Sequence, residues 1–121
     1  MELWLRRVYD RTEEGPEKRI LVDRLWPRGV KKEAIPTWAK QIAPSRELHN
    51  WYKEHDGDFQ GFRERYEKEL SLNPVFPLFL DALEKALKKG PVVFLYAKKS
   101  KEENNAVVLR DYVLRALRKE N

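Results

Sequence analysis

The sequence predicts a small α/β protein in which a sheet of about three strands, at least partly parallel, is packed by about four helices. The chain has 121 residues, a length that suits a single α/β domain covering residues 1–121. The run VVFLYA at 92–97 is continuously apolar, which is typical of a strand buried on both faces in the centre of a parallel sheet. Between 59 and 87, apolar residues recur at spacings of three and four, which is typical of amphipathic helices.

The first half of the chain predicts two strands and a long loop. Residues 3–9 are short, aromatic and β-prone, and residues 19–26 form a second strand that Pro27 ends. The nine residues between them, 10–18, are few for a helical crossover, so we expect the two strands to be antiparallel neighbours. The stretch that follows contains three prolines, and we expect an ordered loop there with a short helix around Trp38.

The second half predicts helices with recognisable ends. Ser45 is an N-cap for a helix over 46–54, and Asp58 is an N-cap for the next helix. Gly90 and Pro91 end a third helix. Apolar stripes mark the core-facing sides of the second and third helices: Phe59, Phe62, Tyr66 and Leu70 in the second, and Phe76, Phe79, Leu80, Leu83 and Leu87 in the third.

A last amphipathic helix follows the strand at 92–97, and its start has two alternatives. Ser100 with Glu103 fits a capping box, whereas Asn104 or Asn105 would cap the helix about one turn later.

The composition excludes several kinds of site. The chain has no Cys, which rules out thiolate chemistry, zinc fingers and iron–sulfur clusters. Its two histidines, His49 and His55, are six residues apart and would lie on different faces of one helix, so we predict no metal and no cofactor. The N-terminal segment does not have the pattern of a signal peptide, and the apolar runs are far shorter than a membrane span. We therefore expect a cytoplasmic protein without membrane contact.

The net charge of +5 is unevenly distributed along the chain. Residues 1–45 carry 10 basic and 7 acidic groups, residues 46–90 carry 8 and 9, and residues 91–121 carry 7 and 4. The basic excess therefore lies in the two outer thirds, which contain the predicted strands, and it favours an anionic partner. Charged residues make up 37% of the chain, a thermophile-like composition.

Candidate ligand-binding residues follow two of the predicted strands. Ligands of open α/β sheets bind beyond the carboxyl ends of the strands, next to helix N-termini. Arg24 and Arg28 carry guanidinium groups suited to a phosphate or carboxylate, Trp26 offers a ring for stacking, and the last helix begins near the two asparagines. The candidate ligand-binding residues are therefore Arg24, Trp26, Arg28, Asn104 and Asn105, with Lys40 and Tyr96 at the edge of the site.

Asp23 is the candidate catalytic residue, because a carboxylate within an apolar strand must be solvated, paired or protonated. It is either a general base or ligand-orienting carboxylate, or one half of a buried ion pair with an arginine. Arg24 and Arg28 have the matching alternative, since an arginine near a strand end commonly pairs with a carboxylate. Trp26 and Tyr96 also have a structural alternative to ligand binding, because aromatic rings at strand ends are more often part of the core.

Three segments resemble a known family: LVDRLWPRGVKKE at 21–33, WAKQIAPSRELHNWY at 38–52 and LYAKKSKEENNAVVLRDYV at 95–113. Together they resemble the family called domain of unknown function 488, in its short YeaO-like branch, over nearly the whole chain. The resemblance implies a small prokaryotic α/β domain without an established activity. Longer members carry a Cys-His-Arg-type motif before the last helix, where this chain has Glu103, Asn104 and Asn105. The cysteine nucleophile of that motif is missing from this chain. The resemblance therefore implies at most an anion-binding site at this position.

These observations support three hypotheses about function. The leading one is binding, with or without turnover, of a small anionic or phosphate-bearing ligand at the C-terminal ends of the strands. The first alternative is a nucleic-acid-associated module that uses the basic excess and exposed aromatic rings. The second is a non-catalytic protein-interaction domain whose polar residues serve the fold.

Overall fold

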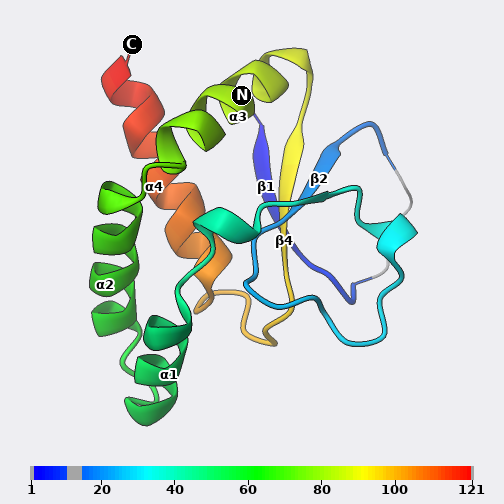
Figure 1. The fold of residues 1–121 in the computed structure, drawn as a ribbon. Helices are drawn as coiled ribbons and strands as arrows, with labels where there is room; N and C mark the ends of the chain where they lie inside the picture. The colour runs from blue at the N-terminus through cyan, green and yellow to red at the C-terminus, as the bar shows by residue number, and fades with distance from the viewer. Residues whose placement is uncertain (1, 11–14, 121) are drawn as a thin grey trace.

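The described part of the chain, residues 2–10 and 15–120 of a computed structural model, contains one sheet of four parallel strands in the order β1–β4–β2–β3 (Figure 1). The strands are β1 (Leu3–Arg7), β2 (Lys18–Leu21), β3 (Thr37–Trp38) and β4 (Val92–Tyr96). The predicted α/β class is confirmed. The sheet has one strand more than the three expected, because the two-residue β3 pairs with β2 at the edge.

β4 occupies the interior of the sheet because its apolar sequence needs cover on both faces. All five of its residues are buried. Phe94, in the middle of β4, pairs with Leu5 of β1 on one side and with Ile20 of β2 on the other. The central parallel strand predicted from the apolar run is therefore confirmed.

β1 and β2 are not neighbours, so the expectation of an antiparallel pair was wrong. β4 separates them and is parallel to both. The ten residues 8–17 connect the end of β1 to the start of β2, and an extended chain of that length reaches about 33 Å. A five-residue strand is only about 17 Å long, so this connection can run back along the sheet without a helix.

β2 is shorter than the strand predicted over 19–26. The N–H of Val22 still donates to the carbonyl of Leu95 at 3.1 Å, but β4 ends one residue after Leu95. The chain beyond Val22 therefore has no strand beside it, and Leu25 is 58% exposed. Asp23, predicted to lie inside the strand, stands just past its end.

The α-helices cover one face of the sheet (Figure 1). They are α1 (Arg46–Glu54), α2 (Phe59–Leu72), α3 (Phe76–Lys89) and α4 (Asn105–Glu120). The predicted stripes of α2 and α3 pack, together with buried residues of α4, against Ile20, Val92 and Phe94 of the sheet. About four helices were predicted, and the described residues contain four α-helices.

The long loop between β2 and α1 covers the second face. Leu21, Val93 and Leu95 form a separate buried cluster there, against which Trp26 and Trp38 pack. The two tryptophan rings meet edge to face at 5.4 Å. A short helix was expected around Trp38, but Thr37–Trp38 is a strand because it pairs with β2. Single 3₁₀ turns lie on either side of it, at Lys32–Ala34 and Lys40–Ile42.

The helix starts agree with the predicted caps. Ser45 Oγ accepts the N–H of Leu48 at 3.0 Å at the start of α1, and Asp58 accepts the N–H of Gly61 at 2.9 Å at the start of α2. For α4 the later of the two alternatives is correct, because Asn104 Oδ1 accepts the N–H of Val107 at 2.9 Å. Each cap satisfies a backbone donor that the helix itself leaves without a partner.

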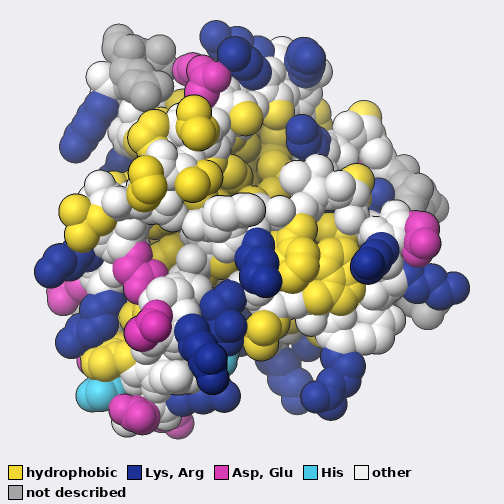
Figure 2. All heavy atoms as spheres, in the orientation of Figure 1, with side chains coloured by type: hydrophobic (Ala, Val, Ile, Leu, Met, Phe, Trp, Pro, Cys, Tyr) yellow, Lys and Arg dark blue, Asp and Glu magenta, His cyan; other side chains and the backbone are white. Residues whose placement is uncertain are grey.

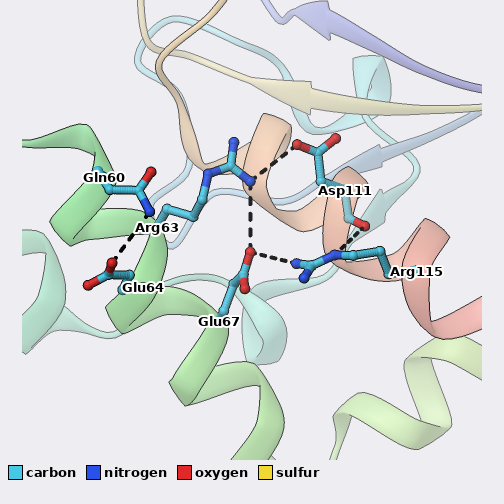
Figure 3. A network of polar contacts seen from close by, with 6 residues as sticks. All are labelled: Gln60, Arg63, Glu64, Glu67, Asp111 and Arg115. Carbon is cyan, nitrogen blue, oxygen red and sulfur yellow. Dashed lines mark hydrogen bonds and ion pairs between the residues drawn. The ribbon is translucent and has the colours of Figure 1, made fainter.

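Ion pairs join α2 to α4 on the outer side of the helical layer (Figure 3). Glu67 of α2 lies 2.6 Å from Arg115 of α4 and 3.7 Å from Arg63, one turn away in its own helix. Arg63 in turn lies 3.2 Å from Asp111 of α4. All four side chains are partly exposed, and an exposed pair contributes about 0.2–1 kcal/mol.

The surface mixes both charges with a few exposed apolar side chains. Figure 2 shows Lys and Arg side chains spread over the whole of that face, with most of the acidic side chains over α1 and α2. Leu72 and Leu78, near the connection between α2 and α3, are 73% and 71% exposed. Within the described residues, no helix has the length and apolar character that crossing a membrane requires.

Candidate anion-binding site

The candidate site lies where β2 and β4 end and α4 begins. Because the strands are parallel, their carboxyl ends share one edge of the sheet. The last backbone contact between the two strands, Val22 to Leu95, is followed directly by a side-chain contact: Asp23 Oδ2 accepts the N–H of Ala97 at 3.0 Å. The loops that follow β2 and β4 therefore meet at this edge.

Asn105, the first residue of α4, ties the helix to the end of β2. Its amide nitrogen donates to the carbonyl of Val22 at 3.0 Å and to Asp23 Oδ1 at 3.1 Å. Both partners are acceptors, so the orientation of the amide is determined by its contacts. Asp23 thus accepts hydrogen bonds from two elements of the chain, the β4–α4 loop and α4.

Burial raises the pKa of Asp23 above its ordinary value, and the hydrogen bonds from Asn105 and Ala97 oppose this shift without cancelling it. No Lys or Arg among the described residues forms an ion pair with Asp23. The alternative of a buried ion pair with an arginine is therefore not what the described residues show.

A cavity of about 550 Å³ opens at this edge, and we call it the strand-end cavity. Its size is that of pockets that hold small organic ligands. The apolar part of its wall comes from three places: the loop after β2, the start of α1 and the core side of α2. The residues that line it are Asp23, Arg24, Leu25, Trp26, Pro44, His49, Tyr52, Lys53, Asp56, Phe62, Ala97, Lys98, Asn104 and Asn105.

Arg24 is the most unusual residue of the strand-end cavity. Its Nε is buried and has no hydrogen-bond partner, and its guanidinium forms no ion pair with any described residue. A buried donor without an acceptor is costly and rare in native proteins. The alternative that Arg24 pairs with a carboxylate is therefore not realised within the described chain.

α1 contributes a face of the strand-end cavity that sequence reasoning missed. His49, Tyr52 and Lys53 line the cavity from α1, at spacings of three and four from His49, and Asp56 lines it from the turn just after the helix. This is the spacing of one helix face, so the pattern was available in the sequence. It escaped notice because a polar helix face normally faces solvent.

Two further side chains of this wall, those of His49 and Lys98, are affected by their neighbours. Burial, with the nearby charges of Lys53 and Arg24, lowers the pKa of His49. Lys98, in the loop after β4, reaches α1: its Nζ donates to the hydroxyl of Tyr52 at 3.2 Å and lies 4.4 Å from the centre of that ring. The lining of the strand-end cavity therefore holds three basic side chains, those of Arg24, Lys53 and Lys98, and the acidic side chains of Asp23 and Asp56.

The structure brings together only part of the predicted residue set. Asp23, Arg24, Trp26, Asn104 and Asn105 line the strand-end cavity, although both polar groups of the Asn104 side chain are taken up by Ser100 and Val107. The remaining three predicted residues, Arg28, Lys40 and Tyr96, do not line it.

Each of these three residues has another environment. Arg28 is exposed in a turn that Gly29 completes with a φ of 79°, a left-handed conformation that favours glycine. Tyr96 is buried in β4, and burial raises its pKa. Lys40 lies over the ring of Trp38, 5.1 Å from its centre.

A second cavity, of about 600 Å³, lies on the other side of Arg24 between α1 and the C-terminal half of α2. It contains Lys40 and the carboxylate of Glu69, which accepts hydrogen bonds from both the N–H and the hydroxyl of Ser45. A carboxylate at a helix N-terminus stabilises the helix through its dipole. Glu69 is thus satisfied within the fold.

The lining of the strand-end cavity limits the side-chain chemistry that is available there. Its lining contains no Ser, Thr or Cys, so no hydroxyl or thiol nucleophile of these types is present there. No group of three or more His, Asp or Glu that could hold a metal ion occurs among residues 2–10 and 15–120. What the lining offers is cationic donors on one side, acceptor atoms on another and apolar walls between them.

The fold and the site define a small two-layer α/β protein with a parallel sheet and a charged cavity at its strand ends. A family model matches residues 2–121 and is described as the inactive DUF488-N3 subclade. The chain belongs to this family, and the resemblance seen in its sequence segments is confirmed.

The similar curated proteins are uncharacterised. The chain is 41% identical to the uncharacterized protein YeaO of Escherichia coli (strain K12) over 115 residues, which cover 93% of this chain and 97% of YeaO. It is also 41% identical to the uncharacterized protein Rv3073c of Mycobacterium tuberculosis (strain ATCC 25618 / H37Rv) over 66 residues, which cover 53% of this chain and 56% of that protein. No solved structure matches the chain.

Proposed function

We propose that the strand-end cavity binds a small organic anion, carrying a phosphate or a carboxylate, without turning it over. The observation that carries this proposal is the state of Arg24, a buried guanidinium nitrogen without an acceptor in the wall of a ligand-sized cavity. An anionic oxygen in the cavity that reached the guanidinium of Arg24 would be held by charge-assisted hydrogen bonds. Lys53 and Lys98 line the same cavity and add to its positive potential.

The apolar walls support a ligand with a body as well as a charge. Trp26, Tyr52 and Phe62 place aromatic surface around the cavity, and flat groups pack well on such surfaces. A bare inorganic anion would leave most of this apolar wall uncovered. An organic anion of about the size that a 550 Å³ cavity admits fits both properties.

Binding without turnover is supported by the absence of Ser, Thr and Cys from the lining and by the description of the family as an inactive subclade. Asp23 then acts as a ligand-orienting carboxylate rather than as a general base. This role uses its fixed position between Ala97 and Asn105.

The test compares two arginine variants in a ligand screen. Wild type, Arg24→Gln and Arg28→Gln are heated with phosphate, nucleoside monophosphates and aromatic carboxylates, and affinities are then measured by calorimetry. A ligand at one hundred times its Kd stabilises the native state by about 2.7 kcal/mol, which is a readily measured rise in Tm. We expect Arg24→Gln to weaken binding roughly tenfold to a hundredfold, since a charged hydrogen bond contributes about 1.5–3 kcal/mol.

Arg28→Gln is the matched control, because Arg28 carries the same charge in the same loop but does not line the strand-end cavity. It should bind the ligands as wild type does. Without ligand, Arg24→Gln should melt no lower than wild type, since the guanidinium makes no hydrogen bond that the substitution removes and its buried Nε has no acceptor. The proposal fails if no organic anion raises the Tm of wild type, or if the two variants bind equally well.

A nucleic-acid role is the alternative that the charge distribution favours. Lys99 and Lys101 are exposed in the loop after β4, beside Lys98 of the strand-end cavity. A single-stranded oligonucleotide therefore belongs in the same screen. Binding to it that weakens steeply with salt, without any response to the small anions, would favour this alternative.

A further inference from the structure

Two neighbouring residues of opposite charge both lack an ionic partner in the strand-end cavity. Asp23 and Arg24 are consecutive in sequence and both line the cavity. Neither forms an ion pair with any described residue, and they do not pair with each other. Desolvated charges are stabilised by partners of opposite sign. A ligand would therefore have to offer a hydrogen-bond donor to Asp23 and an anionic group to Arg24.

The acceptor side of this arrangement is built around Asp23 and Asn105. Each Asp23 oxygen accepts one hydrogen bond from the protein, and a carboxylate oxygen has room for another. The amide nitrogen of Asn105 is used by Val22 and Asp23. Its Oδ1 accepts no hydrogen bond from the described residues, so it is a second acceptor in the same wall.

Simple ions do not fit both sides of the strand-end cavity. A small anion alone would satisfy Arg24 but would add negative charge beside Asp23. A small cation or amine alone would satisfy Asp23 but would add positive charge near Arg24, Lys53 and Lys98. At a few ångströms in a partly buried site, such like-charge contacts cost several times what they cost in water.

We infer that the ligand carries an amino or ring N–H group in addition to its anionic group, an inference that rests on the proposed function of anion binding. The N–H group donates to the carboxylate of Asp23 and to Asn105 Oδ1, while the phosphate or carboxylate binds Arg24 and the lysines. The aromatic wall formed by Trp26, Tyr52 and Phe62 holds the body that joins the two groups. The ligand class is therefore an amino-bearing organic anion.

The experiment uses two series of probes that share an anionic group and differ in whether they carry an N–H donor. Adenosine 5′-monophosphate is compared with its N6,N6-dimethyl derivative and with ribose 5-phosphate, and 4-aminobenzoate is compared with 4-dimethylaminobenzoate and benzoate. Their Kd values are measured on the wild-type protein by calorimetry. In at least one series, we expect the amino-bearing compound to bind about tenfold more tightly than both partners that lack the N–H donor.

Variants then assign this preference to its residue. Asp23→Asn should abolish the tenfold preference while leaving the affinity for ribose 5-phosphate or benzoate unchanged or higher. Asp56→Asn is the matched control, because it removes the other carboxylate of the lining and should leave the preference intact. The comparison of methylated and unmethylated probes needs no substitution, so it remains decisive even if Asp23→Asn folds poorly.

The outcomes separate this inference from the function on which it rests. If the probes with and without the N–H donor bind equally well in both series, anion binding stands and the inference is overturned. A preference that survives in Asp23→Asn overturns it as well. If no probe binds wild type at all, the proposed function and the inference fail together.

Discussion

At the scale of single residues, the site depends on how Asp23 and Arg24 diverge immediately after β2. Asp23 is held by a backbone N–H of the β4–α4 loop and by the first side chain of α4. Arg24 borders both cavities, with Pro44 as the other residue that they share. The chain thus separates two opposite charges that lie next to each other in sequence.

Stability should depend on pH through Asp23. Its pKa is raised in the folded protein from the ordinary 3.8, so the folded state binds this proton more readily than the unfolded state. The contribution of Asp23 to the free energy of unfolding therefore rises as pH falls from neutral through the raised pKa, and levels off below the ordinary value. Asp23→Asn removes this dependence.

Urea unfolding of wild type and Asp23→Asn between pH 7 and about pH 4 measures the effect, because the raised pKa of Asp23 places its titration in this range. The difference in unfolding free energy between the two proteins should move in favour of wild type as the pH is lowered. A difference that stays constant across this range would show that Asp23 does not titrate in the window that its burial implies.

Sequence reasoning expected Asp23, Arg24, Trp26, Asn104 and Asn105 at one site because strand ends concentrate unusual polar residues, and these five line the strand-end cavity. Arg28, whose charge and sequence neighbourhood look the same as those of Arg24, does not line it. The left-handed turn at Gly29 decides the difference, since it leaves Arg28 exposed at the surface. Which side of a loop an arginine faces depends on such a turn and on the packing of Trp26, neither of which residue type alone reveals.

At the scale of elements, the start of α4 divides two tasks between adjacent asparagines. Asn104 is buried and caps the helix, accepting from Val107 and donating to the carbonyl of Ser100 at 2.9 Å. Asn105 instead faces the sheet and contacts Val22 and Asp23. The position of α4, and with it one wall of the strand-end cavity, is set by this pair.

Asn104→Ala should lower the free energy of unfolding by about 1–2 kcal/mol, because it removes the cap and leaves a buried backbone N–H unsatisfied. Asn104→Asp is the control: its carboxylate keeps the capping oxygen and interacts favourably with the helix dipole. It should retain more stability than Asn104→Ala in urea unfolding. Equal losses in the two variants would mean that the contact with Ser100, rather than the cap, is the important one.

The helices were predictable because their determinants are local. The N-caps Ser45 and Asp58 and the apolar spacing of α2 and α3 can be read from a few consecutive residues. The ends of β2 and the existence of β3 depend instead on which strand lies alongside. Pairing of this kind joins residues that are distant in sequence, so a window of neighbouring residues does not contain the information.

At the scale of the whole molecule, the ion pairs of Figure 3 connect two helices that belong to the same layer. Glu67→Gln should lower the free energy of unfolding by about 1 kcal/mol or less at low salt, since it breaks two partly exposed pairs. In 1 M NaCl, where the Debye length is only about 3 Å, most of this difference should disappear.

Glu64→Gln is the matched control, because the polar contact of Glu64 is with the uncharged side chain of Gln60. It should change stability by less than Glu67→Gln does at low salt. Thermal unfolding of the three proteins at two salt concentrations decides the matter. A loss in Glu67→Gln that is the same at both concentrations would assign its effect to packing rather than to charge.

The order of strands in the sheet was the least predictable property of the fold. The apolar run of β4 correctly indicated a central parallel strand, but the partners of that strand were not visible in it. The assumption that a short connection joins antiparallel neighbours failed for β1 and β2, which β4 separates and to both of which it is parallel. A short strand needs only a short return path, so connection length is a weak guide to strand direction here.

The order of strands in the sheet also constrains the time course of synthesis. β1 is made first but pairs only with β4, whose residues follow after three of the four α-helices in the described chain. While the nascent chain is still emerging from the ribosome, β1 has no edge to join, and β2 has only its two-residue contact with β3. The sheet, and therefore the strand-end cavity, forms only after β4 has been synthesised and has inserted between β1 and β2.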